Sequence, residues 1–317
     1  MNHDDHDPPT PDHEAPRQAD GPVRQAVAPA DQRPAADRAV LYRAGPQEAP
    51  SPFPAPSPSS YVYAIGKIEA RFPLLSVEKE FAQIAGRTET AGRTDPQVLH
   101  AVLSDPANRY LARLMCWVLT VREIETYLLR PRDPGDIALL VDTIRPEPSP
   151  LDLDVVIGTR GPLAPPDLCN GLTVPMVAFD QIYSFDRASL ITAIPRSDSM
   201  TDEQFDAAAA QVLDLILQVA DNAGADDGHR ALNYLAMRYP EIYRKTSGMF
   251  ASDFALTGVE VRASAFGGAR RVVDCVFSYT SRRAGFTEKA AVSVDVTDEF
   301  PFLVSRLSTY YDRFGSL

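Results

Sequence analysis

Cys169 is a candidate for a reactive residue in this sequence, because it ends a proline-rich loop and precedes an apolar run. A cysteine nucleophile needs an imidazole to accept its proton and usually a carboxamide or carboxylate to orient that ring. His229 and Asn233 follow Cys169 in an order that such an arrangement permits. However, Asn170-Gly171 indicates a turn, and not the helix N-terminus that would lower the pKa of the thiol. We therefore expect Cys169 to be a framework residue, and catalysis by Cys169 with His229 is the alternative.

Metal binding by cysteine and histidine is a second chemistry to consider. Structural zinc sites usually draw paired ligands from short spacings such as C-x-x-C. The cysteines of this chain are far apart in the sequence: Cys116, Cys169 and Cys275. Only folding could bring them to His100 or His229, and buried thiols are commoner. The remaining histidines, His3, His6 and His13, stand among carboxylates near the N-terminus. We expect no metal site and no cofactor.

Two carboxylate pairs, Asp152/Asp154 and Asp180/Asp186, could supply a general acid or a hydrogen-bonding group. Asp186 is well placed to cap the helix that we expect directly after it. Asp180 is a third, weaker catalytic candidate, and a hydrogen-bonding role fits it better. The sequence has no phosphate-binding G-x-x-x-x-G-K-[ST] loop, no G-x-S-x-G and no H-E-x-x-H. The assignment as an enzyme therefore stays uncertain, and the sequence leans against it.

Aromatic residues next to polar ones give a different kind of candidate site. Such residues with one wet edge are typical of peptide grooves and protein interfaces, and equally of half-buried strands. We predict that a peptide or a partner protein contacts four residues of this kind: Asp180, Tyr183, Phe185 and Tyr239.

Composition divides the chain into a tail, residues 1–60, and a folded part, residues 61–317. The tail is rich in proline and has almost no periodic apolar residues, so it cannot bury enough surface to offset the entropy of ordering. We expect it to be disordered.

The formal net charge of the whole chain is −12, which disfavours binding to nucleic acids or anionic membranes. A local basic patch, formed by Arg270-Arg271 and Arg282-Arg283 across a hairpin, is an alternative to charged strand ends in water. No apolar run is long enough to span a bilayer, and the first residues lack the apolar segment of a secretory signal. The three cysteines fit a reducing compartment better than a disulfide framework. We expect a cytoplasmic protein.

Residue patterns predict an α+β fold with antiparallel strands, hairpins and segregated helices. Helices are expected after Ser76, after Asp133, over 201–224, over 227–239 and after Pro240. Strands are expected over 61–72, over 114–121 with 125–130 as a hairpin, and over the LDLDVVIGTRG segment. Three alternating segments after residue 257 predict a three-stranded antiparallel meander. A short amphipathic helix over 300–311 is expected to follow the meander.

Several long strings in the folded part resemble one protein family: YVYAIGKIEARFP, NRYLARLMCWVLTVREIETYLLRPRDP, DVVIGTRGPLAPPDLCNGL, FDQIYSFDR and TEKAAVSVDVTDEFPFLVSRLSTYYDR. They are similar to the C-terminal domain of unknown function in the cyanobactin maturation proteins PatG and PatA. The resemblance implies a setting in the biosynthesis of ribosomally made, post-translationally modified peptides. In PatG and PatA the domain follows a protease, whereas here the tail takes that place. Proteolysis and macrocyclisation are therefore not implied for this chain, and the family domain has no established catalytic residues.

From this resemblance we expect an accessory protein that binds a precursor peptide or docks a maturation protease or modifying enzyme. Amphipathic aromatics and the absence of a catalytic signature favour this hypothesis. The alternative is a peptide-modifying enzyme that uses Cys169 and His229. A homodimer is a further arrangement that the sequence leaves open.

Overall fold

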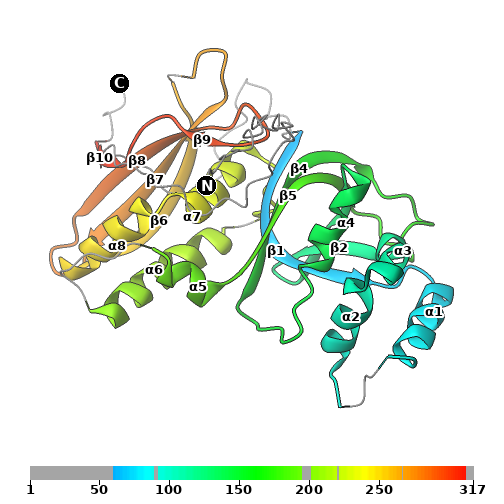
Figure 1. Cartoon of the computed structure of the whole chain (residues 1–317). Coiled ribbons are helices and arrows are strands. Elements are labelled where there is room, and N and C mark those ends of the chain that lie inside the picture. Colours follow the sequence, from blue (N-terminus) through cyan, green and yellow to red (C-terminus); the bar gives the residue numbers. More distant parts are fainter. Residues whose placement is uncertain (1–59, 89–91, 195–200, 220, 266, 312–317) are drawn as a thin grey trace, which may run out of the picture. The chain divides into compact units, whose positions relative to one another are not determined.

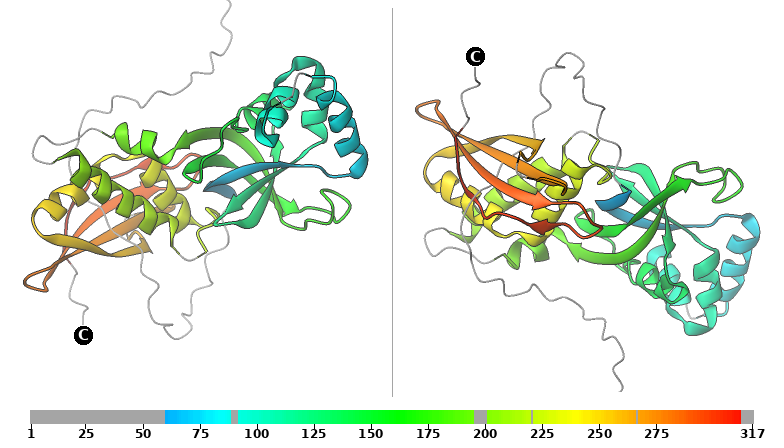
Figure 2. Two further views of the ribbon diagram at one scale, coloured as in Figure 1. Left: turned by 90° about the horizontal axis from the view of Figure 1, so that it is seen from below. Right: turned by 90° about the horizontal axis from the view of Figure 1, so that it is seen from above.

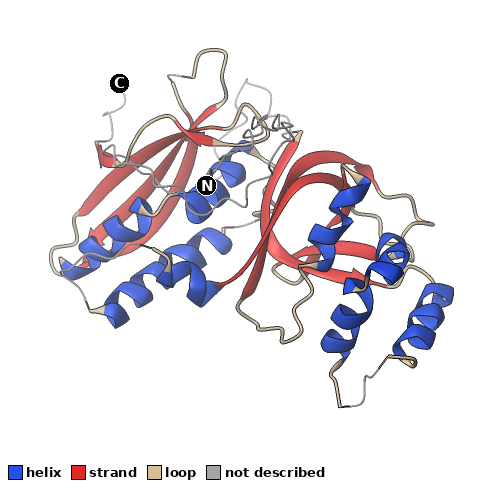
Figure 3. Ribbon diagram, in the orientation of Figure 1, coloured by secondary structure: helices blue, strands red, loops and turns tan. Residues whose placement is uncertain are grey.

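The computed structural model describes residues 60–88, 92–194, 201–219, 221–265 and 267–311. Apart from Ser60, the tail that we predicted to be disordered lies outside these residues. The α+β class is confirmed, because mostly antiparallel sheets combine with helices that occupy separate stretches of the chain (Figure 3).

A closed five-stranded barrel is built from the first half of the described chain (Figure 1). Its strands are β1 (Tyr61–Arg71), β2 (Cys116–Val121), β3 (Ile124–Pro131), β4 (Asp152–Leu163) and β5 (Pro175–Asp186). They pair in the order β1-β2-β3-β5-β4, and the β3–β5 pair is parallel while the others are antiparallel. This is a Greek-key barrel of the OB type. The architecture alone assigns no function.

Short helices join the strands of the barrel. Between β1 and β2 lie α1 (Leu75–Ala85), α2 (Asp95–Ser104), the 3-10 turn η1 (Pro106–Asn108) and α3 (Arg109–Leu114), and between β3 and β4 lie η2 (Pro134–Asp136) and α4 (Ile137–Val141). Thr94 and Gln97 form a capping box at the start of α2. The predicted hairpin of β2 and β3 is confirmed, and its turn residues Arg122 and Glu123 both have positive φ angles, as a tight hairpin turn requires.

The second sheet contains the predicted meander, which is confirmed as β6 (Phe254–Ala263), β7 (Val272–Ser281) and β8 (Thr287–Asp295). The helices that accompany it are α5 (Arg187–Thr192), α6 (Asp202–Leu217), α7 (Asp227–Arg238) and α8 (Glu241–Ala251). Figure 2 shows α6 to α8 on one face of this sheet. Asp186 caps α5 as expected, because its carboxylate accepts hydrogen bonds from the backbone of Ala188 and Ser189. No helix in the described ranges is long and apolar enough to cross a membrane.

The predicted helix over 300–311 is wrong. The segment instead forms the short strands β9 (Phe302–Leu303) and β10 (Ser308–Tyr310), and both pair with β8. Backbone pairing along β8 satisfies donors and acceptors that an edge strand would leave open, and this gain outweighs the weak helical periodicity of the segment.

The alternative of a local basic patch is also wrong. Arg270 and Arg283 lie at opposite ends of β7, and each has its own acidic partner: Asp295 at 2.6 Å and Asp253 at 2.5 Å.

Two hydrophobic cores share the strand β1. The barrel core takes Val62 and Ala64, together with barrel residues such as Trp117, Val156 and Phe179. The sheet core takes Tyr63 and Ile65, together with residues such as Phe205, Leu232 and Phe277. Because successive side chains of a strand point to opposite faces, the first half of β1 is buried on both sides.

The loop that precedes α7 docks directly on β1. The backbone N–H of Tyr63 donates to the Gly224 carbonyl at 2.9 Å, and the Asn233 side chain donates to the Tyr63 carbonyl at 2.8 Å. Gly224 has a φ of 68°, and a Cβ atom at this position would lie 2.2 Å from the Tyr63 carbonyl oxygen. The predicted helix over 201–224 therefore ends early, at Leu217, and Gly224 serves as a docking residue.

We expect Gly224→Ala to lower the free energy of unfolding by at least about 2 kcal/mol, because it combines a steric clash with an unfavourable φ. The matched control is Gly248→Ala in α8, where a Cβ atom meets no neighbour within 4 Å. This change should be neutral or should stabilise by about 0.5–1 kcal/mol. Urea denaturation followed by circular dichroism measures both, and equal stability of the two variants would contradict the docking role of Gly224.

Candidate functional site

A cavity of about 550 Å³ lies between β1, the helices α1 and α2, and the segment that joins α4 to β4. We call it the β1 cavity. Its volume is within the range of sites that bind small ligands or short peptide segments. Apolar side chains make up most of its wall: Ile68, Phe72, Phe81, Val98, Leu99 and Ile144.

The apolar wall is the incompletely covered rim of the barrel core. Its side chains pack against the buried core residues but remain half-buried themselves. The rings of Phe72 and Phe81, for example, contact each other with their centroids 5.2 Å apart. Covering this rim with an apolar group would remove further surface from water, which is the main source of affinity for such a site.

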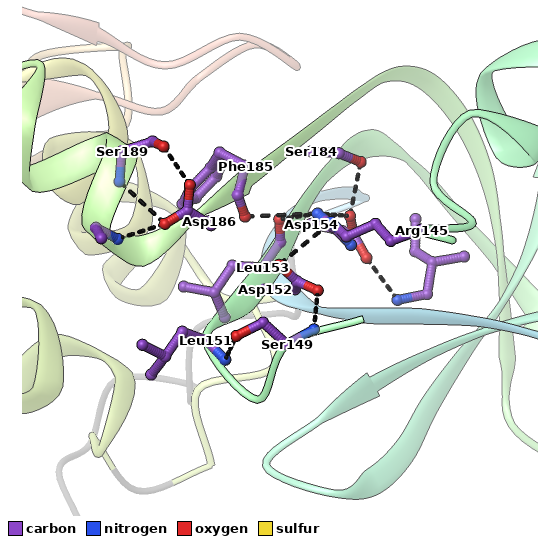
Figure 4. Close-up of polar contacts among 12 residues, drawn as sticks. Arg145, Ser149, Leu151, Asp152, Leu153, Asp154, Ser184, Phe185, Asp186 and Ser189 are labelled. Atoms are coloured by element: carbon purple, nitrogen blue, oxygen red, sulfur yellow. Dashed lines mark hydrogen bonds and ion pairs between the residues drawn. The ribbon is translucent and has the colours of Figure 1, made fainter. Parts of the chain in front are cut away.

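One end of the β1 cavity is polar and centres on Asp154 of β4 (Figure 4). Asp154 is fully buried. Its Oδ2 accepts a hydrogen bond from the Ile68 backbone N–H at 2.8 Å, and its Oδ1 accepts one from the Ser184 hydroxyl at 2.7 Å. A buried carboxylate is tolerated only when it is paired and hydrogen-bonded, and Asp154 meets both conditions.

Arg145 holds this end of the cavity together. Its Nη2 donates to Asp154 Oδ1 at 3.1 Å and to the carbonyls of Leu153 and Phe185, and its Nε lies 3.5 Å from Asp152 Oδ1. Asp152 in turn accepts a hydrogen bond from the Ser149 backbone at 2.6 Å (Figure 4). One guanidinium thus joins two carboxylates and two strands.

The environment of Asp154 changes its titration. Burial raises the pKa of the Asp154 carboxyl above its ordinary value of 3.8, although hydrogen bonds from Ser184 and Ile68 and the charge of Arg145 oppose the rise. A perturbed carboxyl beside a cavity is a common feature of functional sites, and buried structural ion pairs produce it as well.

The charge around the β1 cavity is negative. Four carboxylates line it, from Glu69, Asp95, Asp152 and Asp154, against the two cations Lys67 and Arg145. An acidic ligand would be repelled, whereas a neutral or basic one would be accepted.

The residues that we predicted as peptide or partner contacts do not line this cavity. Tyr183 and Phe185 of β5 pack against the sheet core, on the opposite face of the strand from Ser184. The Tyr239 side chain is buried, and its hydroxyl accepts a hydrogen bond from the Leu307 N–H at 2.9 Å. Asp180 is partly exposed and lies 3.4 Å from Arg132. Tyr183 and Phe185 serve as framework because strand alternation turns them toward the sheet core, and Tyr239 is buried in the same core at the end of α7.

The catalytic alternative for Cys169 is contradicted. Cys169 forms a disulfide with Cys116, so the expectation of free thiols is also wrong for this pair. A disulfide sulfur offers no thiolate nucleophile. His229 is buried, with its Nδ1 2.5 Å from Asp226 Oδ2, and Asn233 binds Tyr63 and Asn222. The Cys169, His229 and Asn233 side chains are therefore each engaged elsewhere and form no catalytic triad.

Cys169 instead stabilises the loop between β4 and β5. It packs with Cys116, Val118 and Leu128 in a small cluster, and it and Asn170 both have positive φ angles. The Asn-Gly turn that follows the cysteine was correctly interpreted as a turn. Within the residues described here, no group of three or more His, Cys, Asp or Glu side chains is arranged to hold a metal ion.

The sequence drew attention to the pair Asp152 and Asp154, but not to Arg145 or to the apolar rim. A local signal was present in the string RPEPSPLDLD, residues 145–154. Prolines at every second position prevent a strand from forming a ladder of hydrogen bonds, so the string indicates that strand pairing is interrupted just before β4.

Comparison with known proteins supports the resemblance seen in the sequence. Residues 199–310 match a family model described as PatG C-terminal. A solved structure titled "PatG Domain of Unknown Function" has a TM-score of 0.64 and 19% sequence identity, and the match covers 80% of this chain and 99% of that one. At this identity the match shows a shared fold. No curated protein matches the sequence. The resemblance to the C-terminal domain of PatG is therefore confirmed.

We expect alkylation under denaturing, non-reducing conditions to label Cys275 alone, and labelling after reduction to include Cys116 and Cys169. The disulfide joins residues 53 positions apart, so Cys169→Ala should destabilise the protein by about 2–4 kcal/mol. Mass spectrometry measures the labelling of each cysteine, and urea denaturation measures the stability. Labelling of all three cysteines before reduction would contradict the disulfide, while Cys275 serves as the internal control.

We expect the stability contribution of Asp154 to fall as the pH rises. Because the folded-state pKa lies above 3.8, the contribution is complete below that value and is lost as the pH passes the folded pKa. The difference in unfolding free energy between the natural protein and Asp154→Asn should therefore shrink over this window. Asp186→Asn is the control of opposite sign, since hydrogen bonds from Ser189 lower the pKa of Asp186. Its contribution is lost as the pH falls, and identical profiles for the two variants would refute the assignment.

Proposed function

We propose that this chain is a non-catalytic accessory module in the maturation of a ribosomally made peptide, and that the β1 cavity binds a segment of the precursor. The confirmed resemblance to the C-terminal domain of PatG supports this setting. The family model does not include the residues of the cavity, because they lie between Lys67 and Asp154 and the match to the model begins at residue 199. The choice of a binding role depends on the cavity itself.

The observation that carries the proposal is an apolar cavity of about 550 Å³ with a small, fully hydrogen-bonded polar end. Such a site can bury a few apolar side chains of a ligand and fix their orientation with polar groups. A flat docking interface for a whole enzyme would be larger and would have no need of a cavity. For this reason a precursor peptide is a better occupant than a maturation protease or modifying enzyme.

The polar end of the cavity favours binding over catalysis. Every oxygen of Asp154 already accepts a hydrogen bond, and Asp152 is occupied by Arg145 and Ser149. A general acid or base must be able to reach the proton that it transfers, and these carboxylates are committed to the protein. The alternative of a peptide-modifying enzyme with Cys169 and His229 loses its nucleophile to the disulfide.

We expect fluorescently labelled peptides from the precursor encoded nearest to this gene to bind the natural protein, and Phe81→Ala to weaken the binding roughly tenfold, because an aromatic wall of the cavity is lost. Fluorescence anisotropy measures the affinity. The matched control is Leu163→Ala, which removes an exposed side chain of the same barrel outside the cavity and should leave the affinity unchanged.

Mass spectrometry of the same peptides, before and after incubation with the protein, tests the absence of catalysis. We expect no change of peptide mass. Conversion of the peptide, or binding that is equally strong in the Phe81→Ala and natural proteins, would overturn the proposed function.

A further inference from the structure

We infer that the bound peptide lies in an extended conformation along β1 and adds a strand to it at Ile68–Phe72. This inference rests on the proposed function and specifies how the peptide is held. The peptide that fits is apolar at alternate positions and carries neutral or basic groups, but no acidic ones.

The first step is the pairing of β1, which changes partner in the middle. Residues 61–66 pair with β4, and residues 67–71 pair with β2 on the other side. The edge of β1 that faced β4 therefore becomes open after Gly66. This open edge lines the β1 cavity, since Lys67, Ile68, Glu69, Ala70 and Phe72 are among its walls.

The second step is the direction of the backbone groups along this edge. The Tyr63 N–H points to Gly224, away from β4, whereas the Ile68 N–H points to Asp154 of β4. Because backbone groups alternate along a strand, Ala70 directs its N–H and C=O to the same open side as Ile68. On that side the pairing of β1 with β4 extends only as far as Gly66, so the register gives Ala70 no strand partner there.

The third step explains why the protein does not close this edge itself. In the register of the β1–β4 pair, Gly66 lies opposite Asp154, so an extended β4 would place Pro150 opposite Ala70 and Pro148 opposite Phe72. Proline has no N–H to donate to a ladder. The chain turns away instead, with Asp152 N–H bonded to the Ser149 carbonyl.

Asp154 marks the end of the protein's own pairing. Its carboxylate accepts the hydrogen bond from the Ile68 N–H, which the next backbone carbonyl of an extended β4 would otherwise accept. A peptide strand can therefore begin beyond Ile68 N–H and pair with the Ile68 carbonyl, with both groups of Ala70 and with the Phe72 N–H. Strand addition of this kind supplies affinity through main-chain hydrogen bonds and specificity through alternate side chains.

The walls of the cavity define the side chains of the occupant. On a strand that pairs with β1, every second side chain points to the apolar rim that includes Phe81 and Leu99. The other side chains face outward. The excess of carboxylates around the cavity, including Glu69 and Asp95, favours basic flanking groups over acidic ones.

The test uses a short synthetic peptide with valine at alternate positions and lysine at both ends. We expect it to bind, to slow hydrogen exchange of the Ala70 amide at least roughly tenfold, and to bind more tightly than the same peptide with glutamate ends. Ala70→Pro should weaken binding roughly tenfold, because proline removes the N–H at an edge that β2 does not use. Nuclear magnetic resonance measures the exchange, and fluorescence anisotropy the affinity.

Two peptide variants provide a matched control that does not depend on how well Ala70→Pro folds. N-methyl groups are placed on alternate backbone amides of the peptide, in two sets of opposite parity. One set blocks the amides that face β1 and should abolish binding, and the other should bind nearly as well as the unmodified peptide.

Each other outcome has a definite meaning. Binding that depends on Phe81 but is equal for both N-methylated sets would overturn strand addition and leave the proposed function intact. The same conclusion follows if the lysine-flanked peptide does not bind while precursor peptides do. Absence of any Phe81-dependent binding by either kind of peptide would overturn both proposals.

Discussion

The alternation of β1 between two hydrophobic cores is the constraint on which the rest of the structure depends. Tyr63 and Ile65 enter the sheet core while Val62 and Ala64 enter the barrel core. A slip of one residue would exchange the two sets, so neither core could form as it does. The backbone of the same stretch is fixed on its remaining edge by Gly224 and Asn233. The register of β1 is therefore specified by side chains on two faces and by hydrogen bonds on two edges.

The β1 cavity begins where this double support ends. Gly66 is the last residue that pairs with β4, and a Cβ atom there would lie 2.3 Å from the Thr120 carbonyl oxygen, so β1 and β2 approach closely at the change of partner. Beyond it, β1 keeps one neighbouring strand and a partly covered apolar face. Asp154 and Arg145 complete the polar groups at the point of divergence. The same strand thus supplies rigid framework in its first half and an open surface in its second half.

Local features of the fold could be predicted from the sequence, and long-range ones could not. The period-2 segments, the hairpin at Arg122-Glu123 and the Asp186 cap depend on neighbours in the chain, and the structure confirms them. The pairing of Cys116 with Cys169 and the approach of Arg145 to Asp154 depend on folding, and no local pattern specified either. The last segment was mistaken for a helix because pairing with β8 overrode its periodicity. Tyr183 and Phe185 were chosen as aromatic residues beside polar ones, a pattern that half-buried strands also produce.

The prolines that precede β4 prevent pairing with β1 because of the alternate positions that they occupy in the register of the two strands. Pro146, Pro148 and Pro150 share the parity of Asp152 and Asp154, so the missing amide hydrogens fall on the side that faces the neighbouring strand. A deletion of one residue from this stretch would leave its composition almost unchanged, yet it would turn ordinary amides toward that side. An extended β4 could then pair with β1 beyond Gly66 and close the open edge. Relatives of this protein that keep this edge of β1 open should therefore preserve the spacing of these prolines more strictly than the residues between them.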